Sequence, residues 1–180
     1  MENKNKEITG YVLGFLMFVL LVPFLMWLVS GMPDLWVIPM LKMVFTGESG
    51  LGALNGLRMA LVVLFSVLGL SLSVWSIVYM RRKGDGNPMD AFGHEVAPRT
   101  KHLMTGGPYR FSRNPMLSGI FLYLIGCGVY LWTWQAAVFF VVFVVVMLLQ
   151  VRSEEQRLRR DFGEEYEAYC RRTGCFFPKM

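Results

Sequence analysis

The stretch NPMLSGIFLYLIGCGVYLWTWQAAVFFVVFVVVMLLQV, residues 114–151, contains no Asp, Glu, Lys or Arg in 38 consecutive residues. As one α-helix it would be about 57 Å long at about 1.5 Å per residue, nearly twice the roughly 30 Å hydrocarbon core of a bilayer. The run must therefore fold back on itself. Its predicted turn is Trp132-Thr133-Trp134-Gln135, because tryptophan favours the membrane interface. The two halves, residues 116–131 and 136–151, then form a helical hairpin.

Two more uncharged runs precede this hairpin. The first covers residues 8–33, with its most apolar part at 11–29, and the second covers residues 59–80 and ends at Arg81. Each is long enough to cross a membrane as a helix. Residues 35–45 are apolar but too short to cross, so we expect an interfacial or re-entrant piece there. The sequence thus predicts an all-α integral membrane protein with four transmembrane helices, a C-terminal helical hairpin and a cytoplasmic C-terminal helix.

The composition excludes most soluble classes of protein. Hydrophobic residues make up 54% of the chain and charged residues only 17%, with a mean hydropathy of +0.44, whereas soluble domains are about 25% charged. The net charge of +5 is gathered into short stretches between apolar runs, which favours membrane lipids and not nucleic acid as the partner. Three cysteines and two histidines show no zinc-ligand spacing and cannot form a disulfide framework, so we expect no metal.

The basic residues predict the orientation. Sixteen of the eighteen lie in the N-terminal tail, the loop 81–113 and the tail from residue 152, whereas Lys42 and Arg58 lie between the first two spans. Because basic residues concentrate on the cytoplasmic side, we expect both termini and the active site in the cytoplasm, at the cytoplasmic membrane if the protein is bacterial. We expect residues 1–180 to form a single membrane domain, since no cytoplasmic piece is large enough for its own core.

The polar stretches 100–119 and 152–172 flank the hairpin and should therefore be neighbours in space. Together they offer a Gly-Gly-Pro turn, Arg110, Arg113, two aromatic rings and the pair Glu154-Glu155. A ligand with a carboxylate, an ammonium group, a ring and hydroxyls would suit that set.

Simpler explanations also exist for these residues. The arginines could serve as positive-inside anchors, and His102 could be solvated. The two glutamates begin a charged stretch in which Glu155 and Arg159 form an i,i+4 pair on a solvated face. Their position favours a site, because they lie about one turn beyond the last apolar residue, where acidic side chains are costly.

The order and spacing of these motifs resemble one family. LMTGGPYRFSRNPMLSG at residues 103–119, Glu154-Glu155 after the hairpin, and FGEEYEAY at residues 162–169 resemble the isoprenylcysteine carboxyl methyltransferases and their relatives among phospholipid methyltransferases. The resemblance covers about residues 103–178. Two positions depart from it: Asn114 stands where eukaryotic members have histidine, and Leu117 replaces the usual tyrosine.

The resemblance implies a membrane enzyme that uses S-adenosylmethionine and a cofactor-binding region at residues 100–178. The acceptor would be lipid-like, with a prenylcysteine-type carboxylate, an amine or a thiol, or else a small molecule. The implied cofactor-binding residues are His102, Leu103, Thr105, Gly107, Pro108, Tyr109, Arg113, Asn114, Pro115, Gly119, Glu154 and Glu155.

No residue is assigned a catalytic role, because methyl transfer from a sulfonium needs positioning and a partly dry site more than an acid or a base. The alternative is an NADPH-dependent sterol or enone reductase, since such enzymes resemble the family in their C-terminal half. A third possibility is a non-catalytic lipid-binding or scaffold protein.

Overall fold

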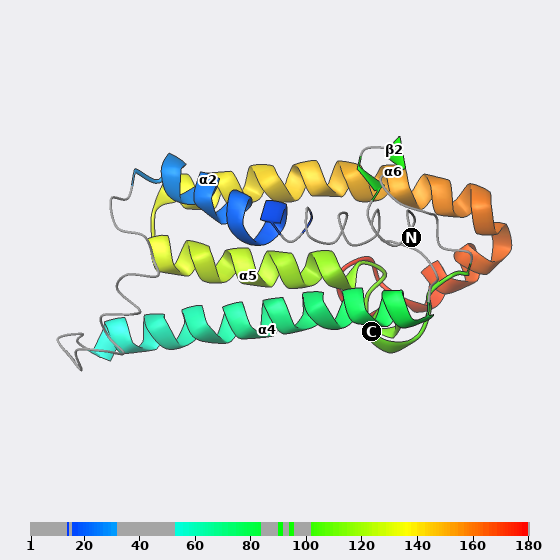
Figure 1. The fold of residues 1–180 in the computed structure, drawn as a ribbon, viewed down its shortest axis with the longest axis horizontal. Helices are drawn as coiled ribbons and strands as arrows, with labels where there is room; N and C mark the ends of the chain where they lie inside the picture. The colour runs from blue at the N-terminus through cyan, green and yellow to red at the C-terminus, as the bar shows by residue number, and fades with distance from the viewer. Residues whose placement is uncertain are drawn as a thin grey trace, which may run out of the picture.

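A computed structural model describes residues 14, 16–31, 53–83, 90–91, 94–95 and 102–179 (Figure 1). The predictions for the N-terminal tail, for the start of the first uncharged run, for the interfacial piece 35–45 with Lys42, and for most of the loop 84–101 lie outside these residues.

The described chain is helical, as predicted. A π-helix, η1 (Leu16–Leu21), continues into α2 (Val22–Val29), and α4 covers Ala53–Lys83. A short 3-10 helix, η2 (Gly107–Arg110), precedes α5 (Pro115–Leu131) and α6 (Trp134–Arg172). The only strands among the described residues are β1 (Asp90–Ala91) and β2 (His94–Glu95), an antiparallel pair of two residues each.

The predicted hairpin is present. α5 begins at Pro115, which needs no amide donor in a first turn, and it ends before Trp132, whose φ of 49° is left-handed. Thr133 then caps α6, and its hydroxyl accepts a hydrogen bond from the Ala136 amide at 3.3 Å. The turn is therefore tighter than predicted, because Trp134 and Gln135 already belong to the first turn of α6.

The second arm of the hairpin continues well past residue 151. We expected a separate cytoplasmic helix to begin near Glu154 and Glu155. Instead, α6 runs without interruption through both residues. The chain has no proline or glycine between 136 and 162, and nothing in the sequence ends the helix at the apolar boundary. The helix kinks only at Gly163, where φ is 49° and ψ is −122°. Figure 1 shows the orange-to-red end of α6 turning back toward the ends of α4 and α5.

Within the part of the chain that the structure describes, two helices have the length and apolar composition to cross a membrane, Gly56–Lys83 and Trp134–Arg172. Met17–Val29 and Pro115–Leu131 are apolar but shorter. Four spans and their orientation remain a prediction.

Arg58 lies within α4 and not in a loop before it. Its guanidinium donates to the carbonyls of Val129 and Tyr130 at the end of α5, and it lies 5.7 Å from the centre of the Trp132 ring. The start of α4 is thereby attached to the tip of the hairpin.

The closest helix packing is between α4 and α5. A Cβ placed on Gly69 would lie 2.5 Å from the Gly119 carbonyl oxygen, and one on Gly119 would lie 2.3 Å from Ser73 Oγ. Ser73 in turn donates to the Met116 carbonyl at 3.0 Å. Small residues allow this backbone contact, which is typical of helix pairs in membranes. On its other side α5 shares a core with η1, α2 and α6, built around Met26, Tyr123 and Leu124.

We expect Gly119→Ala to destabilise the protein by about 1–3 kcal/mol, because a methyl group there overpacks the α4–α5 contact. The melting temperature in detergent should fall by roughly 2–4 °C per kcal/mol. Gly56→Ala is the matched control, since a Cβ at Gly56 meets no atom within 4 Å. Equal melting temperatures for the two variants would contradict the packing argument.

Candidate functional site

A pocket lies at the end of the bundle where α4 and the first part of α6 finish. Its walls come from the loop before α5, from the α6 residues just past the apolar run, and from the α6 segment beyond the kink. The lining residues are Met80, His102, Leu103, Met104, Tyr109, Arg113, Asn114, Val151, Glu154, Glu155, Arg157, Leu158, Asp161, Phe162, Tyr166 and Tyr169.

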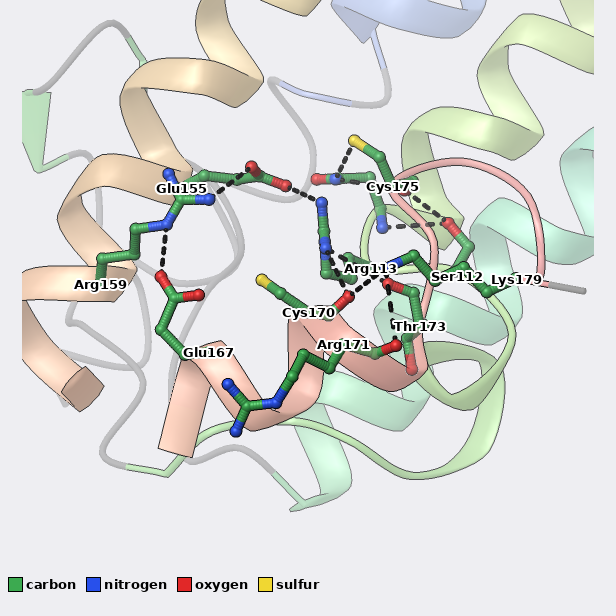
Figure 2. A network of polar contacts seen from close by, with 11 residues as sticks. Ser112, Arg113, Glu155, Arg159, Glu167, Cys170, Arg171, Thr173, Cys175 and Lys179 are labelled. Carbon is green, nitrogen blue, oxygen red and sulfur yellow. Dashed lines mark hydrogen bonds and ion pairs between the residues drawn. The ribbon is translucent and has the colours of Figure 1, made fainter. Parts of the chain in front are cut away.

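Arg113 is at the centre of this region (Figure 2). Its Nη2 lies 2.6 Å from Glu155 Oε1, and both side chains are nearly buried, with 13% and 14% exposed. Its Nη1 donates to the carbonyls of Cys170 at 3.4 Å and Thr173 at 3.2 Å. One side chain thus joins the loop before α5 to both parts of α6.

The backbone around Arg113 is held by the C-terminal residues. The Arg113 amide donates to the Gly174 carbonyl at 2.9 Å, and the Asn114 amide donates to the Cys175 carbonyl at 3.1 Å. The Asn114 side chain reaches Cys175 as well, with its Nδ2 3.4 Å from the carbonyl oxygen and 3.5 Å from Sγ. Asn114 therefore anchors the C-terminal residues and does not cap α5 with its side chain.

An ion-pair chain crosses the kink at Gly163. Glu155 Oε2 lies 3.9 Å from Arg159, the predicted i,i+4 pair, and Arg159 Nε lies 2.9 Å from Glu167 Oε1 beyond the kink. The second contact is exposed and contributes little stability by itself. It does join the two parts of α6 on the same side as Arg113 (Figure 2).

Glu154 has no such partner: among the described residues no hydrogen bond or ion pair reaches its carboxylate. Burial, together with the negative charge of Glu155, raises the pKa of Glu154 to about 7. Near neutral pH about half of this carboxyl group is therefore charged.

An aromatic cluster forms another wall. Tyr166 and Tyr169 are buried, with Leu103, Leu158 and Phe162 packed against them. The Tyr169 hydroxyl donates to the Tyr109 carbonyl at 2.6 Å, which ties the segment beyond the kink to η2. Burial raises the pKa of both Tyr166 and Tyr169, so their phenols stay neutral.

The structure brings together seven of the twelve residues predicted for the cofactor: His102, Leu103, Tyr109, Arg113, Asn114, Glu154 and Glu155. Thr105 is exposed and Pro108 and Pro115 are buried, and none of the three lines the pocket. Leu117, which replaces a tyrosine of the family pattern, is buried in α5 away from the lining.

The two predicted glycines serve helix and loop packing. Gly107 has a φ of 57°, and a Cβ there would lie 2.4 Å from the Tyr79 ring of α4. Gly119 lies in the α4–α5 contact described above. Both positions require the absence of a side chain, but neither faces the pocket.

The sequence analysis did not name Phe162, Tyr166 and Tyr169 as site residues. Tyr166 and Tyr169 are spaced three residues apart within an otherwise charged stretch, which would place them on one helix face, and that pattern could have identified them. Met80 had no such signal, because it is the last apolar residue of a long apolar helix.

The donors and acceptors of the pocket fit a small zwitterionic ligand. Glu154 is a carboxylate without a donor, and the buried Nε of Arg113 has no acceptor among the described residues. The enclosed volume is about 80 Å³, enough for several water molecules, so a nucleoside-sized ligand would also occupy the open side. Among the described residues no group of three or more His, Cys, Asp or Glu side chains could hold a metal ion.

Comparison with known proteins gives two matches. The sequence profile described as phospholipid methyltransferase matches residues 57–165, which include α5, most of α4 and most of α6. The nickel-cobalt-cadmium resistance protein NccN of Alcaligenes xylosoxydans xylosoxydans is 32% identical over 83 residues, 46% of this chain and 38% of that protein. The chain thus spans well under half of this relative. No solved structure matches the present chain.

We expect Glu154→Gln to stabilise the protein at about pH 8 and to have little effect at about pH 5. The folded-state pKa near 7 lies above the unfolded value, so the free-energy cost of ionising this carboxyl group is absent below about pH 4.5, grows as the pH rises, and is complete above about pH 7. Thermal unfolding across this range measures the effect.

The control for this experiment is Glu164→Gln, which removes an exposed carboxylate from the same helix. Its effect on the melting temperature should not change with pH in this range. A Glu154→Gln variant that is less stable than the parent at pH 8 would mean that the carboxylate has a stabilising partner.

Proposed function

The chain belongs to the phospholipid methyltransferase family, and on that premise we propose that it transfers a methyl group from S-adenosylmethionine to a lipid-like acceptor. The family and the two long apolar helices make it a membrane protein of a methyltransferase family. The family match does not support the NADPH-dependent reductase considered above.

The observation that carries the proposal is the Glu154 carboxyl group, whose pKa burial and Glu155 raise, in the same pocket as a buried Arg113 Nε that has no acceptor among the described residues. Buried polar groups are normally hydrogen-bonded, so such groups require an explanation. The methionine end of the cofactor carries one ammonium and one carboxylate group. Glu154 suits the ammonium group, because a charge-assisted hydrogen bond of this kind is strong in a partly buried site.

The other residues would act by positioning. Glu155 is already paired with Arg113, so we assign it to holding the loop and not to the ligand. Tyr109, Phe162 and Tyr166 would provide aromatic and apolar walls that exclude water. When bound, S-adenosylmethionine supplies a methyl group on a positively charged sulfonium. Its transfer is a displacement that disperses charge, which a dry and well-ordered pocket favours.

The proposed topology has four spans, with both termini and the pocket on the cytoplasmic side, because sixteen of eighteen basic residues lie there. The pocket is then at the membrane surface, at the point where α4 and the apolar part of α6 end. An acceptor with an apolar tail could remain in the bilayer while its head group reaches the pocket.

We expect Glu154→Gln to weaken S-adenosylhomocysteine binding by roughly 10- to 150-fold, the equivalent of about 1.5–3 kcal/mol. Isothermal titration calorimetry in detergent would measure the dissociation constant of S-adenosylhomocysteine for the parent and the variant. The affinity of the parent protein should fall as the pH decreases through about 7, since a protonated Glu154 cannot pair with an ammonium group, and the variant should lose this dependence.

Glu155→Gln is the comparison. Because it leaves Arg113 as an unpaired buried charge, it should lower the melting temperature more than the affinity. If neither substitution changes the affinity for S-adenosylhomocysteine, the glutamates do not bind the cofactor.

We also expect the initial rate of methylation to rise with tail length in a series of acceptors that share one head group. Each methylene buried in the bilayer adds about 0.8 kcal/mol to partitioning. The series is measured in nanodiscs of fixed composition. Rates independent of the tail, together with rapid methylation of a small water-soluble thiol, would contradict the lipid-like acceptor and leave the cofactor assignment intact.

A further inference from the structure

The last residues of the chain fold back on themselves in a tight turn, which we call the C-terminal hook (residues 173–179). A Cβ on Gly174 would lie 1.9 Å from the Phe177 carbonyl oxygen, so the turn requires glycine there. Lys179 Nζ donates to the Cys170 carbonyl at 2.9 Å, at the C-terminal end of α6. The hook therefore folds back onto the C-terminal end of α6.

The hook lies alongside α5 and not beyond its end. The Phe176 ring is 5.4 Å from the ring of Phe121, and Ser118 Oγ donates to the Phe176 carbonyl at 3.1 Å. Phe121 also packs edge-on against Phe140 and Phe143 in the apolar part of α6. Figure 1 shows the red end of the chain beside the N-terminal end of α5.

The length of α5 fixes the depth of this contact. At about 1.5 Å per residue its 17 residues measure about 26 Å, less than the roughly 30 Å of hydrocarbon in a bilayer. If α5 crosses the membrane, as the proposed topology requires, its first turn must lie at the hydrocarbon boundary. Phe121 is six residues further along, about 9 Å deeper, and Phe176 lies beside it.

Phe177 follows Phe176 in the chain and is 80% exposed. Phe111, on the loop whose neighbour Ser112 donates to Cys175, is 56% exposed. The exposed basic residues Arg171 and Arg172 end the helix just before the hook. Exposed aromatic rings beside basic side chains are typical of segments that lie in a membrane interface.

We propose that the C-terminal hook inserts into the cytoplasmic leaflet, with Phe177 among the lipid acyl chains and Arg171 and Arg172 at the level of the phosphates. The inference rests on the topology given under the proposed function. Its consequence concerns the pocket: the carbonyls of Gly174 and Cys175 bind the amides of Arg113 and Asn114. The bilayer would therefore hold the backbone of the loop that carries Arg113.

The test places a photoreactive phenylalanine analogue at one position at a time in the full-length protein, reconstituted in nanodiscs. Position 177 tests the hook. Position 164 is the aqueous control, since Glu164 is exposed on α6 just beyond the kink. Position 145 tests whether the apolar part of α6 lies in the bilayer, because Val145 is half exposed there. Lipid adducts are quantified by mass spectrometry, and S-adenosylhomocysteine binding is measured on each sample.

We expect positions 177 and 145 to give lipid adducts at similar yield, at least several-fold above position 164. If position 145 forms lipid adducts but the adduct yield at position 177 is no higher than at position 164, the proposed insertion of the hook is wrong. The proposed membrane spans would still stand. An absence of adducts at 145 would overturn the topology and the hook together. Cofactor binding is an independent readout, so a failure of the methyltransferase assignment would be seen separately.

Discussion

The ion pair between Arg113 and Glu155 is the interaction on which the end of the bundle that carries the pocket depends. The two residues lie 42 positions apart, on opposite sides of the hairpin, and meet because the hairpin returns the chain to the same surface. Each is nearly buried, and removing one partner would leave an uncompensated charge, which typically costs several kcal/mol. Arg113 also accounts for the position of the residues after the kink, since it binds two carbonyl groups there.

This pair gives the two adjacent glutamates different roles. Glu155 has its charge neutralised and serves the architecture, whereas Glu154 is left with its negative neighbour and an elevated pKa. A carboxylate that destabilises the fold above neutral pH is what a binding site for a cation provides, because the ligand supplies the missing charge. Under the proposed function, stability and cofactor binding are in opposition at this position.

The membrane part of the fold supports the site through α4. Its close contact with α5 at Gly69 and Gly119 sets the two helices side by side, and the end of α4 then reaches the loop before α5. There the Tyr79 ring lies over Gly107 and 6.4 Å from the Tyr109 ring, while the Tyr109 hydroxyl is 3.9 Å from Met80 Sδ. Packing between the apolar helices α4 and α5 thereby positions Met80 and Tyr109, which form one wall of the pocket.

The sequence alone determined the helical class, the hairpin and its turn at Trp132, and the family, because the length of an uncharged run and the order of short motifs are local properties. It also placed Glu154 and Arg113 near one another, because a helical hairpin brings the segments before and after it to the same end of the bundle. It could not separate Glu154 from Glu155, or distinguish the glycines that pack against Tyr79 and Ser73 from residues that line the pocket. Those distinctions depend on side-chain direction: adjacent helical positions point about 100° apart, so only the tertiary contacts decide which carboxylate meets Arg113. The continuation of α6 to Gly163, and the return of the C-terminal residues to bind Arg113 and Asn114, were likewise decided by contacts between segments far apart in the chain.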